Sequence, residues 1–155
     1  MAHPNGAAEV DQVVRPVGYV MLSLVYTGVQ ILHNFGAVAV VGSPAVAWWF
    51  ARDNAAAQCR LAWLLIIGWA AQGASGAGFG MTSYFLKGQL PEISGVALIA
   101  LLAKMVCVTC GFAVGVVYLK TAARWSAPTR LKVWQGMLVL AGIALTAAAF
   151  LRWFL

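Results

Sequence analysis

Four long apolar stretches, separated by short polar segments, make up most of the chain. They cover approximately residues 17–41, 61–81, 95–119 and 133–151. Each is close to the roughly 20 residues that an α-helix needs to cross the hydrocarbon core of a bilayer. Lipid offers no partner for a backbone N–H or C=O, and the apolar residues do not alternate with polar ones, so helices are predicted rather than barrel strands. We therefore expect an all-α protein, an integral membrane four-helix bundle.

The first apolar stretch continues beyond residue 41 to Phe50 and includes Pro44. This length exceeds one untilted crossing, so the first helix should be extended or kinked, with a kink or break near Pro44. Residues 1–16 form a polar lead that we expect to be disordered or to lie on the membrane surface. The predicted organisation is thus a lead over 1–16 and one transmembrane domain over 17–155.

Composition excludes a substantial soluble domain. The 155 residues are 63% apolar and 9% charged, whereas soluble domains are roughly 45–50% apolar and 25% charged. The net charge is +6, but the basic residues stand singly near predicted helix ends and form no run. That distribution favours anchoring at the membrane surface over binding of nucleic acid, so the lipid bilayer is the expected partner.

The basic residues also predict an orientation. Six of them lie in or beside the first and third loops: Arg52, Arg60, Lys120, Arg124, Arg130 and Lys132. Three lie toward the opposite side: Arg15, Lys87 and Arg152. Because cytoplasmic loops carry the excess of Lys and Arg, the first and third loops should be cytoplasmic and both termini extracytoplasmic. We expect the membrane to be a bacterial inner membrane.

Small and polar residues indicate how the helices meet. The pairs Gly76 with Gly80, and Gly111 with Gly115, have the small-xxx-small spacing that lets helix backbones approach, which predicts close contact between the second and third helices. Four further polar residues are expected to form hydrogen bonds between helices: Gln72, Ser75, Thr82 and Gln135.

A polar face on the first helix is the strongest sign of a site. At about 100° per residue, one face carries Ser23, Tyr26, Thr27, Gln30 and Asn34, with His33 at its margin. Polar groups inside a membrane are costly, so this face is expected to point into the bundle. His33 is either a neutral imidazole that joins two helices or a ligand to haem iron or copper. One histidine supplies only one ligand, and a second would come from Met, Lys, Tyr, water or another subunit.

Lys104 lies near the middle of the predicted third helix, where an ammonium group costs roughly 2.5–3.5 kcal/mol on insertion scales. It should point inward or lose its charge, unless its long side chain reaches the headgroup region. It shares a face with Cys107, Gly111 and Gly115.

Cys107 and Cys110 form a CxxC pattern. It has two interpretations: small side chains that pack between helices, or a redox or metal-binding pair. Copper(I) favours soft ligands, and the candidates are Met21, Met81, Met105, Cys107 and Cys110.

The segment LHNFGAVAVVG at residues 32–42, with Lys104 about seventy residues later, resembles the CopD-like group of copper-resistance membrane proteins. It is similar also to the HemJ-type haem-binding protoporphyrinogen oxidases. The resemblance implies four helices and a haem b site, with His33 as axial metal ligand and Lys104 as a catalytic residue beside a propionate or substrate carboxylate. It equally implies copper handling by the same helices. Tyr26, Gln30 and Asn34 are then candidates for binding the cofactor.

Three functions remain open. The first is a membrane haem-binding redox protein, a haem-dependent oxidoreductase that carries out electron transfer between a quinone or porphyrin substrate and another carrier. The second is copper transport or handling. The third is a small accessory subunit of a respiratory or photosynthetic membrane complex, whose partners are other membrane subunits or further copies in a homo-oligomer.

Overall fold

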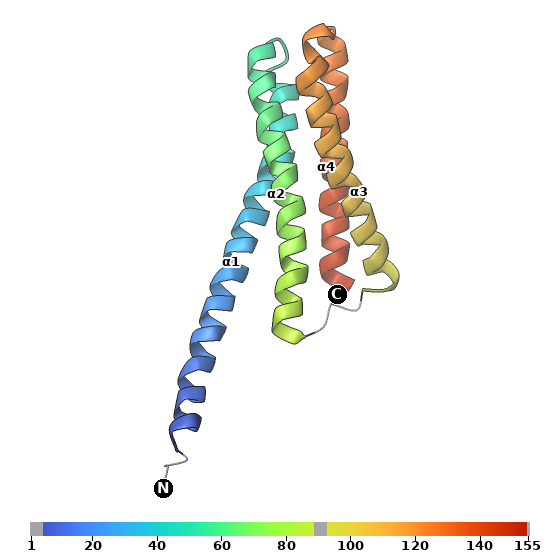
Figure 1. The fold of residues 1–155 in the computed structure, drawn as a ribbon. Coiled ribbons are helices and arrows are strands. Elements are labelled where there is room, and N and C mark those ends of the chain that lie inside the picture. Colours follow the sequence, from blue (N-terminus) through green and yellow to red (C-terminus); the bar gives the residue numbers. More distant parts are fainter. Residues whose placement is uncertain (1–4, 89–92, 155) are drawn as a thin grey trace.

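The computed structural model describes residues 5–88 and 93–154 and contains, over these residues, four α-helices and one short 3-10 helix. Their bounds are α1 (Asn5–Trp49), α2 (Ala55–Lys87), α3 (Gly95–Thr121), η1 (Ala122–Arg124) and α4 (Ala127–Phe154). All four α-helices are long and apolar enough to cross a membrane. The prediction of an all-α, integral membrane four-helix bundle is confirmed (Figure 1).

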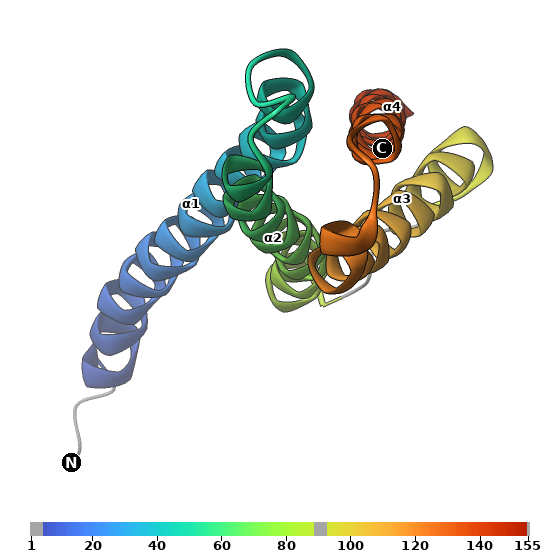
Figure 2. The same cartoon turned by 90° about the horizontal axis from the view of Figure 1, so that it is seen from above.

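The helices run alternately up and down. The α1–α2 and α3–α4 connections therefore lie at one end of the bundle, which we call the loop end, and the chain termini lie toward the other (Figure 1). Seen from above, α1, α2 and α3 form an arc with α4 on its inner side (Figure 2). Both α1 and α3 contact α2 and α4. Toward its N-terminus, α1 leans away from the other three helices (Figures 1 and 2).

The first helix is longer than predicted. It begins at Asn5, so the lead is helical rather than disordered over residues 5–16, and residues 1–4 lie outside the described part of the chain. Adding residues to an existing helix avoids the cost of nucleation, which explains how a polar segment can extend it. An extended first helix is confirmed, but no break occurs at Pro44. Pro44 is fully buried, and contacts on both flanks can hold a helix together across a proline.

The core lies mainly in the half of the bundle nearer the loop end. Its largest buried side chains are Leu65, Trp69, Tyr118, Trp134 and Met137. In α1, no side chain described before Gly36 is buried. The four helices are therefore held together near the loop end, whereas the described side chains of α1 before Gly36 are exposed or half-buried.

A polar cluster at the loop end, the Gln58 network, joins three helices. Tyr118 donates its hydroxyl hydrogen to Gln58 Oε1 (2.6 Å) and accepts a hydrogen bond from Trp134 Nε1 (3.0 Å). Arg130 Nε donates to the same Gln58 oxygen (3.2 Å), and Gln58 Nε2 donates to the carbonyl oxygen of Ala51 (2.9 Å). Gln58 is fully buried, and these contacts satisfy both ends of its amide.

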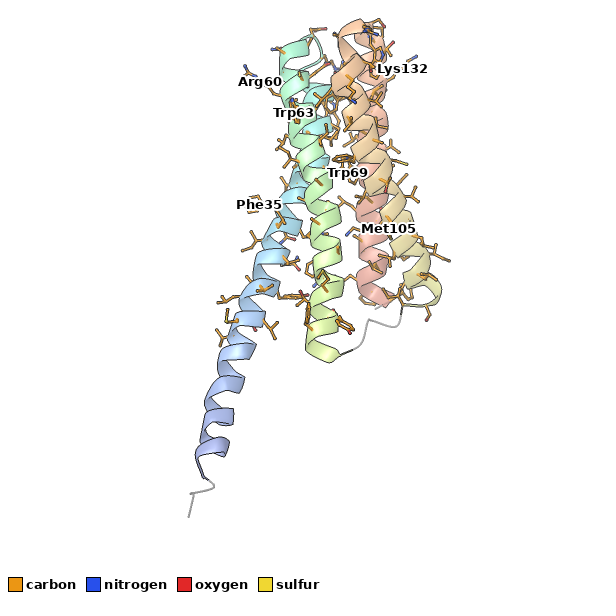
Figure 3. All side chains as sticks on the ribbon, viewed as in Figure 1. Phe35, Arg60, Trp63, Trp69, Met105 and Lys132 are labelled. Atoms are coloured by element: carbon orange, nitrogen blue, oxygen red, sulfur yellow. The ribbon has the colours of Figure 1, made fainter. Side chains whose placement is uncertain are left out.

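Close contact between α2 and α3 is confirmed on the α3 side. A Cβ added at Gly111 would overlap the indole ring of Trp69, and one added at Gly115 would come within 2.7 Å of Ile66 Cγ1. Trp69 reaches from α2 toward α3 (Figure 3). Large side chains on α2 thus fill the space that the two glycines leave on α3.

The expected contribution of Gly76 and Gly80 to this contact is wrong, because no atom lies within 4 Å of a Cβ built at either position. The glycine-to-glycine approach lies instead between α1 and α2. A Cβ at Gly36 would stand 3.2 Å from the Gly68 carbonyl oxygen, and one at Gly68 would stand 3.2 Å from the Gly36 oxygen. These two helix backbones therefore touch almost directly.

Candidate functional site

His33 is held by a serine on the neighbouring helix. Its Nδ1 lies 2.7 Å from Ser75 Oγ, and the Ser75 hydroxyl donates its single hydrogen to the Ala71 carbonyl oxygen (2.5 Å). With that hydrogen given to Ala71, the serine oxygen accepts from the imidazole, an arrangement that places the ring hydrogen on Nδ1 and the lone pair on Nε2. The hydrogen-bond chain thus determines the tautomer of His33.

Lys104 completes the group from α3. Its Nζ lies 3.1 Å from His33 Nε2, and since that nitrogen carries the lone pair, the lysine donates. Hydrogen bonds run from Lys104 on α3 to His33 on α1 and on to Ser75 on α2. We call these three residues the His33 centre. The lysine side chain turns into the bundle rather than toward the headgroup region, as predicted from its position near the middle of the third helix.

Neighbouring side chains on α2 fix both the backbone and the ring of His33. Gln72 Nε2 donates to the His33 carbonyl oxygen (2.6 Å), so Gln72 and Ser75 form hydrogen bonds between helices, as predicted. Thr82 instead bonds within its own helix, to Gly78. The edge of Phe79 meets the imidazole with ring centroids 5.4 Å apart, a contact that sequence reasoning missed because an apolar phenylalanine carries no distinguishing signal in a membrane helix.

The approach of α1 and α2 explains why these contacts form. Gly36 follows His33 by three residues and stands against Gly68, which precedes Gln72 by four. Side chains near this crossing are brought within hydrogen-bonding range of the opposite helix. The close approach at Gly36 and Gly68 therefore allows the hydrogen bonds between α1 and α2 around His33 to form.

Lys104 has no acidic counterpart inside the membrane. All four acidic residues of the chain fall in the N-terminal segment or in loops: Glu9, Asp11, Asp53 and Glu92. A positive charge in a transmembrane helix is normally paired or faces a polar cavity. The His33 centre therefore combines an imidazole with a lysine amine that has no carboxylate partner among the described residues.

Most of the polar face of α1 does not belong to this centre. The prediction that the whole face points into the bundle is wrong for Ser23, Tyr26, Thr27 and Asn34, which are exposed, and Gln30 is half-buried. The side of α1 that carries His33 and Gly36 faces α2 instead, and toward its N-terminus α1 leans away from the other helices (Figure 1).

Of the predicted cofactor-binding residues on this face, only Tyr26 approaches His33, and it does so through Phe79. Its ring centroid lies 5.3 Å from that of Phe79. Gln30 Nε2 donates to Asn34 Oδ1 (3.0 Å). Gln30 and Asn34 thus bond to each other rather than to His33 or Lys104.

The candidate soft copper ligands are spread over several helices. Cys107 is buried in α3, whereas Cys110 is exposed, and the exposed side chains Met21, Met81 and Met105 belong to α1, α2 and α3. Within residues 5–88 and 93–154, no three His, Cys, Asp or Glu side chains lie close enough together to hold a metal ion. His33 is thus the one imidazole in the described part of the chain that could supply a ligand. Comparison of the chain with known protein families, curated proteins and solved structures finds no match.

Proposed function

We propose that the protein is a haem-binding redox protein of the membrane, which passes electrons between a quinone or porphyrin-like substrate and another carrier. In this proposal His33 would supply a ligand to the haem iron, and Lys104 would pair with a haem propionate or a substrate carboxylate. The observation that carries the proposal is the contact between His33 Nε2 and Lys104 Nζ, at 3.1 Å, across α1 and α3.

The orientation of His33 suits a metal ligand. Histidines that bind metals almost always donate the hydrogen of the other ring nitrogen to an acceptor, which fixes the ring and its tautomer. Ser75 accepts that hydrogen here, so Nε2 is the nitrogen available to iron. A bound haem would supply one-electron chemistry, while the surrounding bundle would set ligation and polarity.

Lys104 donates a hydrogen bond to the lone pair on His33 Nε2, and iron would bind the same lone pair. His33 therefore cannot make both contacts at once. The flexible stem of a lysine allows its ammonium group to turn toward a different acceptor. A carboxylate would be a better partner than a neutral imidazole, because it supplies the counter-charge that the membrane helices lack. The lysine therefore favours an anionic group bound next to His33.

The absorption spectrum of the purified protein tests the proposal. We expect a Soret band together with an α-band that appears on reduction, because a b-type haem held by an imidazole gives both. A colourless and iron-free preparation that takes up no haem on reconstitution would contradict it.

Replacing Lys104 by methionine should leave haem binding intact and lower the reduction potential. A nearby cation stabilises the reduced haem, and its loss should shift the potential by on the order of tens of millivolts. Spectroelectrochemical titration measures this shift, with the exposed neighbour Met105 replaced by leucine as the control. Unchanged potential in both variants would remove Lys104 from the proposed site.

We also propose that the loop end faces the cytoplasm of a bacterium, since the residues near it are the more basic ones. Arg60 and Lys132 both lie at this end (Figure 3). Reporter domains fused after Asp53 or Trp125 should be cytoplasmic, and a reporter fused after Leu155 should be extracytoplasmic. The opposite labelling pattern would show that basic residues do not set the orientation of this chain.

A further inference from the structure

Four polar residues line α1 outside the His33 centre: Ser23, Thr27, Gln30 and Asn34, which we call the α1 stripe. Their spacing is four, three and four residues, the 3-4 repeat of a helix seam that meets a parallel partner. Three of the four are exposed and Gln30 is half-buried. The stripe lies in a candidate membrane span, Val20–Trp49.

The stripe enters the hydrocarbon region at its Asn34 end. Trp49 marks the loop end of α1, and at about 1.5 Å per residue Asn34 lies roughly 22 Å and Gln30 roughly 28 Å from it along the helix axis. In a hydrocarbon core of roughly 30 Å, Asn34 therefore lies inside the core and Gln30 at its far edge, whereas Thr27 and Ser23 lie beyond it. Lipid cannot hydrogen-bond to either amide, so uncovered amides at this depth are costly.

Beyond their mutual hydrogen bond, the Gln30 and Asn34 amides keep an acceptor and a donor that can pair with each other across two copies of the chain. Gln30 Nε2 donates to Asn34 Oδ1, which leaves the Gln30 Oε1 acceptor and the Asn34 Nδ2 donor without a partner among the residues described. A second α1 related by a two-fold axis satisfies both at once. Asn34 Nδ2 of each copy can donate to Gln30 Oε1 of the other.

We infer that the protein forms a parallel homodimer through the α1 stripe. Two copies inserted in the same orientation place their α1 helices parallel, with the two-fold axis along the membrane normal. The 3-4 spacing suits a left-handed crossing near 20°, and a polar residue such as Asn34 in the seam fixes the alignment of the two helices. A second helix has access because no described side chain of α1 before Gly36 is buried.

The inference stands apart from the proposed function, because it uses neither His33 nor Lys104. Self-complementarity is what favours a second copy over a different membrane protein. The apolar residues Leu32 and Phe35 lie on another side of α1 and are exposed, and Phe35 points away from the bundle (Figure 3). That side is left to lipid.

Cysteine crosslinking in native membranes locates the interface. In the full chain with Cys59→Ser, Cys107→Ala and Cys110→Ala, a further Thr27→Cys change should give a disulfide-linked dimer on mild oxidation, because seam positions face each other across a parallel pair. Phe35→Cys in the same background is the control and should stay monomeric. Crosslinking at Phe35 and none at Thr27 would overturn the proposed interface.

Dilution in lipid measures the strength of the association. Single-molecule photobleaching of the labelled protein in vesicles should show dimers that dissociate as the lipid-to-protein ratio rises. The double change Gln30→Leu with Asn34→Leu should weaken association by about tenfold or more, since several hydrogen bonds are lost at once. Leu32→Ile with Phe35→Leu, the control on another side of α1, should leave it unchanged. A monomer at every dilution, or equal association of both double variants, would overturn the inference.

Discussion

The Gly111→Leu variant is expected to lose the stable bundle altogether. Even a Cβ at this position would overlap the ring of Trp69, and Trp69 is 1% exposed at the centre of the core, so the ring has little room to move. Overpacking usually costs about 1–3 kcal/mol and sometimes more, and a branched side chain against a fixed indole belongs to the upper end. Thermal unfolding in detergent, followed by circular dichroism, should show a large fall in Tm or no cooperative transition.

Gly76→Leu is the matched control, because nothing lies within 4 Å of a Cβ at Gly76. It should unfold close to the wild-type temperature. Combining Gly111→Ala with Trp69→Phe should recover part of the stability lost in Gly111→Ala alone, since Trp69 Nε1 has no hydrogen-bond partner among the described residues. Equal stability of Gly111→Leu and Gly76→Leu would show that α2 and α3 do not meet at Trp69.

The second large effect is expected at His33, where replacement by alanine should abolish haem binding. In the proposed site His33 would supply the imidazole ligand to iron, and the variant also loses the contacts with Ser75 and Lys104. The Soret band should disappear from the purified variant, and haem titration should give no saturable binding.

His33→Gln separates a ligand from a structural hydrogen-bonding group. Glutamine can still donate to Ser75 and accept from Lys104, but its amide is a poor iron ligand. We expect near wild-type thermal stability without haem. If this variant keeps the wild-type spectrum and activity, His33 serves only to join the helices.

The number of helices and the inward direction of Lys104 could both be predicted from the sequence. The thickness of the bilayer sets the length of a membrane-spanning helix, and hence the number of helices that the chain can form. A lysine nine residues into the 27-residue helix Gly95–Thr121 is costly facing lipid, so it is expected to face the interior of the bundle. The partner of each glycine could not be predicted. A missing side chain allows close approach at Gly76 and at Gly111 alike, but only the fold decides that Trp69 fills one space and that the other stays open.

The uncovered α1 stripe shows a second limit. Helical spacing establishes that Gln30 and Asn34 share a face with Thr27, and the cost of polar groups in lipid says that this face needs a partner. Neither of these two arguments tells whether the partner is another helix of the same chain or a separate molecule. That depends on which side of α1 meets α2, and the contact between Gly36 and Gly68 turns a different side of α1 toward α2.

The Gln58 network and the His33 centre lie at two different levels along the axis of the bundle. Along α2, Gln58 precedes Ser75 by 17 residues, or roughly 25 Å at 1.5 Å per residue. Each group ties three helices together, and α2 and α3 take part in both. In lipid the hydrophobic effect does not resist a change of helix register, so packing and hydrogen bonds must set it. A shift of one residue would turn α3 by about 100° and break both sets of hydrogen bonds together. Two widely spaced polar anchors therefore lock the vertical register and rotation of α3 against α2.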